Sequence, residues 1–226
     1  MNRIWYLSPS SQYANVGIDG YGTEQEQMRK LVHEITPHLD RAGVSFCVAR
    51  SDMTLMSRVT ESNSVHACFH LALHSNAGGN GKAYGPVALY YSDAGKAFGD
   101  KLITALLGLG QASNRSSHLV QNKTLYELRR TQAPACLLEV DFHDSSAGVA
   151  FLTKRRAEIA EAIAKVIIEA DGKEFVPVTS GEYVDEAIRL GLFSHGYNWK
   201  GYLTREEAAK LAVNLIALVN KGGEMT

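Results

Sequence analysis

Three side chains that can bind a metal ion or transfer a proton stand near the expected ends of strands and helices. Glu24 closes the polar loop of "LSPSSQYANVGIDGYGTE", His74 ends the apolar run of "LALHSNAGG", and Glu139 lies in the apolar run of "ACLLEVDFHD". A histidine and a carboxylate are part of a zinc ligand set, and a second carboxylate that binds no metal supplies the general base and acid of metal-assisted hydrolysis. Burial in its apolar run would raise the pKa of Glu139 and suit it to proton transfer near neutral pH.

Each of the three residues also has an explanation that involves no chemistry. A glutamate in the first turn of a helix is favoured by the helix dipole. A histidine at the end of a strand is commonly a hydrogen-bonded residue, and Glu139 could simply face solvent. It is the combination of the three, and not any one of them, that predicts a site.

The elements that must position these residues alternate along the chain. We expect strands over 3–7, 44–50, 67–74, 87–91 and 135–142, and helices over 23–43, 54–64, 95–109 and 154–171. Pro37 falls inside the first helical pattern and predicts a kink or a break. Such alternation is typical of an α/β fold in which a mostly parallel sheet is flanked by helices on both faces. Functional residues should then gather at the carboxyl ends of the strands.

The composition changes near "DGKEFVPVTSGEY", where Gly172, Pro177, Ser180 and Gly181 predict a linker over 172–181. We therefore expect a catalytic domain over 1–171 and a small C-terminal helical module over 182–226. So short a module is marginally stable by itself. It should pack on the first domain or on a copy of itself, which would produce a homo-oligomer.

Charge and hydropathy exclude several classes of partner. The 23 lysines and arginines nearly cancel the 24 aspartates and glutamates, so no global field attracts nucleic acid or an anionic membrane. The N-terminal "MNRIWYLSPSS" has too few apolar residues for a signal peptide or a membrane span, which predicts synthesis and folding in a cytoplasm. The three cysteines lie in apolar runs and are expected to be reduced, buried thiols.

Several segments resemble a known family. The order of "GYGTE", "CVAR", "SRV", "LALHSNAGG", "GPVALYY" and "LYELRRTQAPACLLEVDFHD" is similar to that in the zinc-dependent N-acetylmuramoyl-L-alanine amidases of the Amidase_3 type, over roughly residues 3–168. The most specific segments are "HSNA" and "LRRTQAPACLLEVDF". This resemblance implies that Glu24 and His74 bind Zn²⁺ and that Glu139 activates the attacking water. The bond cleaved would be the amide between N-acetylmuramic acid and the L-Ala of the stem peptide of peptidoglycan.

The opening loop departs from the family pattern. Family members carry a zinc-binding histidine in a "DPGHGG"-like loop, and Ser11 stands at that position here, with Gln12 next to it. We favour Gln12 as the third ligand, although its amide oxygen is a weaker donor than imidazole. His143 is the alternative, unless it is a loop residue bonded to Asp144, and Ser11 is the least favoured.

Other residues have weaker claims on function. Asn76 either steers His74 or the substrate or belongs to a turn, and Arg130 either holds a peptide carboxylate or is solvated. In the C-terminal module, Tyr197, Trp199 and Tyr202 either stack on wall sugars or form the core of the module.

A wall hydrolase without a signal peptide is most simply a phage or prophage endolysin, which stays in the host cytoplasm until release and then acts on the cell wall. A spore or mother-cell lytic enzyme fits the same observation. Two further functions stay open, namely a catalytically inactive peptidoglycan-binding module and a zinc peptidase that acts on stem peptides.

Overall fold

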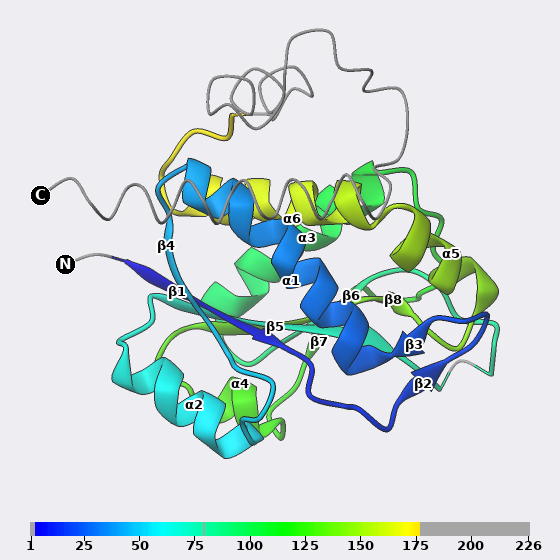
Figure 1. Ribbon diagram of the computed structural model, residues 1–226, viewed down its shortest axis with the longest axis horizontal. Helices are drawn as coiled ribbons and strands as arrows, with labels where there is room; N and C mark the ends of the chain where they lie inside the picture. Colours follow the sequence, from blue (N-terminus) through cyan, green and yellow to red (C-terminus); the bar gives the residue numbers. More distant parts are fainter. Residues whose placement is uncertain (1–2, 79, 177–226) are drawn as a thin grey trace, which may run out of the picture. The chain divides into compact units, whose positions relative to one another are not determined.

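The structure, a computed structural model, describes residues 3–78 and 80–176. Its centre is a six-stranded sheet with the strand order β4-β1-β5-β8-β6-β7 (Figure 1). Neighbouring strands are parallel except for β6 and β8, which are antiparallel, so the expected mostly parallel sheet is confirmed. In sheet order the strands are Ser45–Val48, Ile4–Pro9, Phe69–Asn76, Ala135–Phe142, Val87–Tyr90 and Leu119–Gln121.

Helices cover both faces of this sheet, as the sequence predicts (Figure 1). One face carries α1 (Glu24–Arg41), α3 (Asp93–Gly108) and α6 (Arg156–Ala170). The other carries two shorter helices that contact each other, α2 (Leu55–Ser64) and α4 (Tyr126–Arg130). Helix α5 (Ser146–Lys154) follows β8 and leads into α6. None of the helices in the described ranges is long and apolar enough to cross a membrane.

Helix α1 forms as its apolar spacing predicts. Thr23 caps it, because its hydroxyl accepts a hydrogen bond from the backbone N–H of Glu26 at 3.2 Å, and the residues at spacings of three and four are buried. Pro37 does not break the helix, which continues to Arg41. Burial of Ile35 and Leu39, on either side of the proline, offsets the one backbone hydrogen bond that proline cannot donate.

Alternation along the strands separates two environments. Leu71, Leu73 and Leu138 join the large apolar core under α1, α3 and α6. Their neighbours Ala72 and Leu137 lie on the opposite face, where they form a small apolar cluster with Ala135 of β8 and Leu128 of α4. This second face, under α2 and α4, therefore keeps room for polar side chains.

Some elements differ from the expectations. The opening loop contains a small antiparallel pair, β2 (Val16–Gly17) and β3 (Gly22–Thr23). Strand β7 is only three residues long and largely exposed, which is too short to give a clear strand pattern. A separate helix, α5, precedes α6 because Ser145 caps it through the N–H of Gly148 at 3.1 Å. The chain divides into two compact units, Met1–Phe175 and Val176–Thr226. Residues 177–181 of the expected linker lie outside the described residues, as does the expected module with Tyr197, Trp199 and Tyr202.

Candidate active site

The carboxyl ends of three adjacent parallel strands meet at one edge of the sheet. Strand β1 ends at Pro9 and leads into the opening loop, while His74 of β5 and Glu139 of β8 are direct partners in the strand register. Direct partners on neighbouring strands project to the same face. Gln12, His74 and Glu139 accordingly line one cleft of about 350 Å³ on the face that carries α2 and α4.

Gln12 and Glu24 converge on one ring nitrogen of His74. Oε1 of Glu24 lies 2.7 Å from Nδ1 of His74, and Nε2 of Gln12 lies 3.3 Å from the same atom. Asn15, in the opening loop, orders both groups, because its Nδ2 donates to Oε1 of Gln12 at 2.6 Å and to Oε2 of Glu24 at 2.9 Å. Glu24 itself is buried, as the first residue of α1.

Electrostatics couples Glu24 to His74. Burial alone would raise the pKa of Glu24, but the hydrogen bond and charge of His74, followed by the hydrogen bond from Asn15, outweigh it and hold the pKa below its ordinary value. Burial alone would lower the pKa of His74, yet the contact with Glu24 and the nearby charge of Glu139 raise it. Both shifts favour the charged pair, an imidazolium beside a carboxylate, over two neutral groups.

Glu139 has a different environment. Its Oε2 is closed off from solvent and has no hydrogen-bond partner among the described residues. Burial raises the pKa of Glu139 to about 7, against the lowering effect of His74 and with a smaller contribution from Glu24. A carboxylate with such a pKa can accept and return a proton near neutral pH, which is the property expected of a general base.

The residues at this site fit a zinc ion, with one weak donor. Within residues 3–78 and 80–176, no group of three or more His, Cys, Asp or Glu side chains is placed to hold a metal ion. Gln12 offers a further group beside Glu24 and His74, with its Nε2 3.3 Å from Nδ1 of His74 and its Oε1 accepting a hydrogen bond from Asn15. One imidazole, one carboxylate and one amide oxygen are an acceptable though weakened set for zinc.

His143 does not lie at this cluster, so the expectation that it could supply a ligand is wrong. Its Nδ1 is bonded to the hydroxyl of Ser75 at 2.9 Å, and its ring stacks on Tyr21 at a centroid distance of 5.7 Å. Ser75 follows His74 in β5 and faces the other side of the sheet.

Arg130, Asn76 and Ser11 occupy less central positions. Arg130 is exposed at the end of α4, which lines the cleft with Tyr126 and Glu127 instead, so its expected role in binding substrate is not supported. Asn76 is the last residue of β5, and its Oδ1 accepts a hydrogen bond from the N–H of Ala77 at 2.8 Å. Ser11 lines the cleft beside Gln12.

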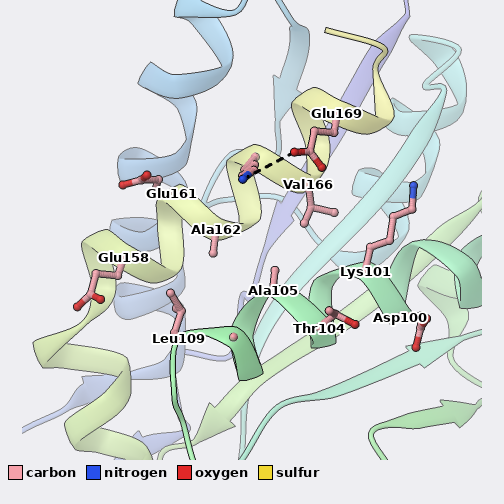
Figure 2. Close-up of a pocket in the computed structure, with 12 residues that line it drawn as sticks. Asp100, Lys101, Thr104, Ala105, Leu109, Glu158, Glu161, Ala162, Val166 and Glu169 are labelled. Atoms are coloured by element: carbon pink, nitrogen blue, oxygen red, sulfur yellow. Dashed lines mark ion pairs between the residues drawn. The ribbon is translucent and has the colours of Figure 1, made fainter. Parts of the chain in front are cut away.

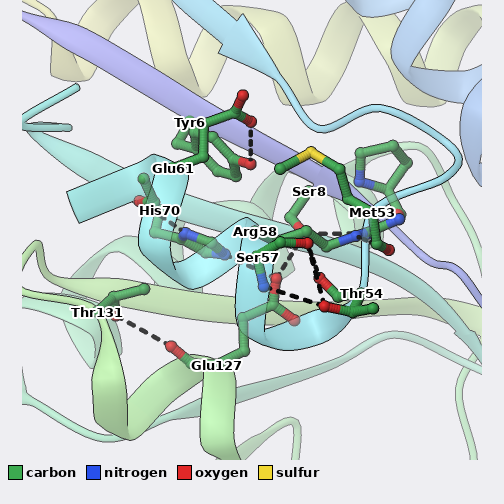
Figure 3. Close-up of polar contacts among 12 residues, drawn as sticks. Tyr6, Ser8, Met53, Thr54, Ser57, Arg58, Glu61, His70, Glu127 and Thr131 are labelled. Carbon is green, nitrogen blue, oxygen red and sulfur yellow. Dashed lines mark hydrogen bonds and ion pairs between the residues drawn. The ribbon is translucent and has the colours of Figure 1, made fainter. Parts of the chain in front are cut away.

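Sequence reasoning missed Asn15 and a buried polar network next to the cleft (Figure 3). Glu127 accepts a hydrogen bond from Ser8 at 2.5 Å and is bonded to Nε2 of His70 at 2.8 Å, while Arg58 donates to Ser8 at 3.3 Å. A usable signal was the alternation of polar residues with apolar ones in "YLS" and "FHLALH", which places His70 on the same face as His74.

A larger cavity of about 700 Å³ lies between α3 and α6 (Figure 2). Alanine, leucine and valine side chains alternate there with exposed lysines and glutamates, of which Lys165 and Glu169 form an ion pair at 4.0 Å. This cavity contains no histidine or cysteine and lies on the face opposite His74, so it has no part in the chemistry of the cleft.

Comparison with known proteins identifies the family of this chain. The family model for N-acetylmuramoyl-L-alanine amidase matches residues 10–169. The probable cell wall amidase LytH of Staphylococcus aureus is 27% identical over 133 residues, which are 59% of this chain and 44% of LytH. This chain therefore matches less than half the length of that relative.

Two solved structures share the fold. The catalytic domain of CwlV, an N-acetylmuramoyl-L-alanine amidase from Bacillus (Paenibacillus) polymyxa var. colistinus, has a TM-score of 0.66 at 20% identity and covers 76% of this chain and 99% of its own. The catalytic domain of the CD27L endolysin, which targets Clostridia difficile, has a TM-score of 0.59 at 21% identity and covers 75% and 98%. Because the family model spans well over half of the sequence, the chain belongs to the N-acetylmuramoyl-L-alanine amidase family.

Proposed function

We propose that this protein is a zinc-dependent peptidoglycan amidase that hydrolyses the bond between N-acetylmuramic acid and the L-Ala of the stem peptide. One observation carries the proposal. The unpartnered, buried Oε2 of Glu139 belongs to the same cleft as the cluster in which Glu24 and Gln12 meet His74. A proton acceptor next to a metal-binding cluster is the arrangement that hydrolysis of an amide requires.

Glu24, His74 and Gln12 would hold the zinc ion. When bound, zinc supplies Lewis acidity, which polarises the scissile carbonyl and lowers the pKa of water. Asn15 would keep the Oε1 of Gln12 and the carboxylate of Glu24 oriented, since it donates to both.

Glu139 would move the protons of the reaction. Its carboxylate accepts a proton from the attacking water as the new carbon–oxygen bond forms at the lactyl carbonyl. The same carboxyl then returns that proton to the nitrogen of L-Ala as the carbon–nitrogen bond breaks, which leaves a free amine and a carboxylate. The pKa of about 7 suits both transfers. A nearby cation would lower this pKa and so favour the ionised carboxylate that accepts the first proton.

The biological setting is part of the same proposal. We expected a phage or prophage endolysin from the sequence, and the fold is shared with an endolysin domain, but the curated relative LytH and several of the solved structures are bacterial amidases. Either setting uses the same substrate, so the chemistry does not depend on this choice.

The test combines zinc content with product analysis. Purified cell walls treated with the protein should release free amino groups without new reducing sugar ends, and a chelator should abolish this release until zinc is restored. Gln12→Ala should lose zinc and activity, whereas Gln12→His should bind zinc more tightly because imidazole is the better donor. Tyr13→Ala, at an exposed neighbouring position, is the matched control and should behave as the unmodified protein.

The weak third donor supports a second candidate function, a peptidoglycan-binding protein without catalytic activity. In that case the unmodified protein would contain no zinc and release no amino groups, yet still sediment with purified walls. Release of amino groups that is unchanged by chelation and by Gln12→Ala would contradict both the zinc site and the role of Gln12.

A further inference from the structure

The cleft extends beyond the residues that the proposed chemistry uses. From Gln12, His74 and Glu139 it continues along a wall of leucines, and Glu127 of α4 also lines it. Three of the wall residues are Leu55 of α2, Leu125 next to α4 and Leu137 of β8. We call this part of the cleft the leucine recess.

Glu127 presents a carboxylate oxygen that no protein group uses. The residue is only 5% exposed, and its Oε1 is occupied by the hydroxyl of Ser8 at 2.5 Å and Nε2 of His70 at 2.8 Å. Its Oε2 receives no hydrogen bond from any residue in the described part of the chain, although the side chain lines the cleft. Because Oε2 is not among the fully buried atoms of the described residues, it is accessible from the cleft, where a ligand donor can replace water.

The surrounding network holds this carboxylate rigidly and keeps it ionised. The hydroxyl of Ser62 is bonded to the other ring nitrogen of His70 at 2.9 Å, so the imidazole that bonds to Glu127 has one orientation. Burial alone would raise the pKa of Glu127, but the hydrogen bond and charge of His70, together with the hydrogen bond from Ser8, lower it below its ordinary value. The recess therefore offers a preorganised acceptor.

The local charge balance selects the kind of donor. Arg58 is 2% exposed and shares Ser8 with Glu127, so the negative charge of the carboxylate already has a cationic neighbour. An ammonium group would have to lose its hydration between leucine side chains for little additional attraction. A neutral N–H donor has a much smaller desolvation cost, and a small aliphatic group beside it would contact the leucines.

We infer that the leucine recess binds the stem peptide next to the cleaved bond, with Oε2 of Glu127 accepting the first backbone N–H beyond L-Ala and the leucines contacting the alanine methyl group. This inference rests on the proposed amidase function, because that function places L-Ala at the cleaved bond. It assigns to Glu127 a role in substrate binding and to the recess a role in selecting a small first residue.

A binding cycle tests the hydrogen bond without requiring turnover. The zinc-loaded Glu139→Gln protein is titrated calorimetrically with N-acetylmuramoyl-L-alanyl-D-isoglutamine and with the same compound methylated on the nitrogen of the isoglutamine. Methylation should weaken binding about tenfold or more, as for loss of a hydrogen bond to a charged group. In the double variant Glu139→Gln, Glu127→Leu, methylation of the ligand should weaken binding far less. Equal losses with and without Glu127 would overturn the inference and indicate only a structural role for this residue.

A second pair of variants tests the recess without disturbing the buried network. Leu55 lines the cleft and Met56, the next residue on α2, does not, and both are exposed, at 44% and 64%. Leu55→Trp should weaken binding of the muramoyl dipeptide several-fold, whereas Met56→Trp should not, and neither should change the unfolding midpoint. If the two variants bind alike, the recess does not contact the peptide.

The experiments distinguish failure of the leucine recess from failure of the proposed amidase function. Release of amino groups from walls, combined with no coupling between Glu127 and the methylated nitrogen, would overturn the recess and leave the amidase in place. Coupling in the binding cycle, combined with no release of amino groups by the unmodified protein, would support the recess in a protein that binds stem peptides without cleaving them.

Discussion

The two faces of the central sheet carry different kinds of side chain, although the same strands build both. In β8, Leu138 is fully buried in the large core under α1, α3 and α6, and the next residue, Glu139, lines the cleft under α2 and α4. In β5, Leu73 and His74 divide in the same way. The period of two in a strand thus assigns one face to burial of apolar area and the other to chemistry.

The polar face itself contains two carboxylates in opposite states. Glu127 has hydrogen-bond partners and a lowered pKa, whereas Glu139 has a buried oxygen without a partner and a raised pKa. The fold therefore stabilises one carboxylate in its ionised form and leaves the other ready to exchange a proton. Such divergence between neighbouring acids is typical of assigned roles in a site.

The largest effect is expected for Glu139→Gln. Removing the general base should lower the rate of amide hydrolysis by about 10²–10⁴-fold, because the transfer of protons loses its carrier. The amide has the same shape as the carboxylic acid, so zinc content should stay close to that of the unmodified protein. Amino-group release from purified walls measures the rate, and a variant that retains the normal rate would contradict the role of Glu139.

Leu138→Ala is the matched change on the other face. Deleting the buried side chain should cost about 2–5 kcal/mol of unfolding free energy, through lost burial and the cavity left behind. Denaturation by urea measures this loss. The rate per folded molecule should remain nearly unchanged at a temperature at which the variant is folded, and a loss of rate as large as that of Glu139→Gln would show that the two faces are not separable.

Much of this division could be predicted from the sequence. The apolar runs in the sequence predicted β1, β5, β6 and β8. In the structure the carboxyl ends of adjacent strands bring His74, Glu139 and the opening loop together, as the α/β pattern implies. The segment "FHLALH" also shows which face is polar, because its alternation places His70 and His74 on the same side of the strand.

The remaining parts depend on register and long-range contacts. The pairing of β5 with β8 is irregular between His74 and Asn76, and His143 follows this irregularity. The alternation of residues along β8 therefore does not predict which face the ring of His143 lies on. Asn15 is one of many polar residues in a loop, and only the folded path of β2 and β3 brings it to both Gln12 and Glu24. Glu127 comes from a helix whose contact with β1 and β5 no local pattern encodes.

Asn15→Ala should weaken zinc binding about 10–100-fold, the usual range for removing a residue that orients metal ligands. The expected cause is loss of the hydrogen bonds that fix Gln12 and Glu24. Competition with a coloured chelator measures the affinity. Tyr13→Ala, on the same loop and 75% exposed, is the control. Unchanged affinity in Asn15→Ala would show that Gln12 and Glu24 do not depend on this residue.

The smallest effect, and the most direct comparison of the two carboxylates, is the pH dependence of stability in the metal-free protein. The pKa of Glu139 rises from 4.5 in the unfolded chain to about 7 on folding, so its contribution is favourable below pH 4.5 and is lost as the pH rises through 7. Glu139→Gln should therefore gain about 1–3 kcal/mol relative to the unmodified protein between pH 4 and pH 8, measured by urea denaturation at each pH.

Glu127 should give the opposite slope. Because its pKa is lowered on folding, its contribution is present above 4.5 and is lost as the pH falls below that value. Glu127→Gln should thus be destabilising at neutral pH and less so in acid. Parallel slopes for the two variants would mean that the network around His70 does not hold Glu127 ionised, and that the cleft does not keep the two acids in different states. Opposite slopes would locate the difference in their hydrogen bonds, since both side chains line the same cleft.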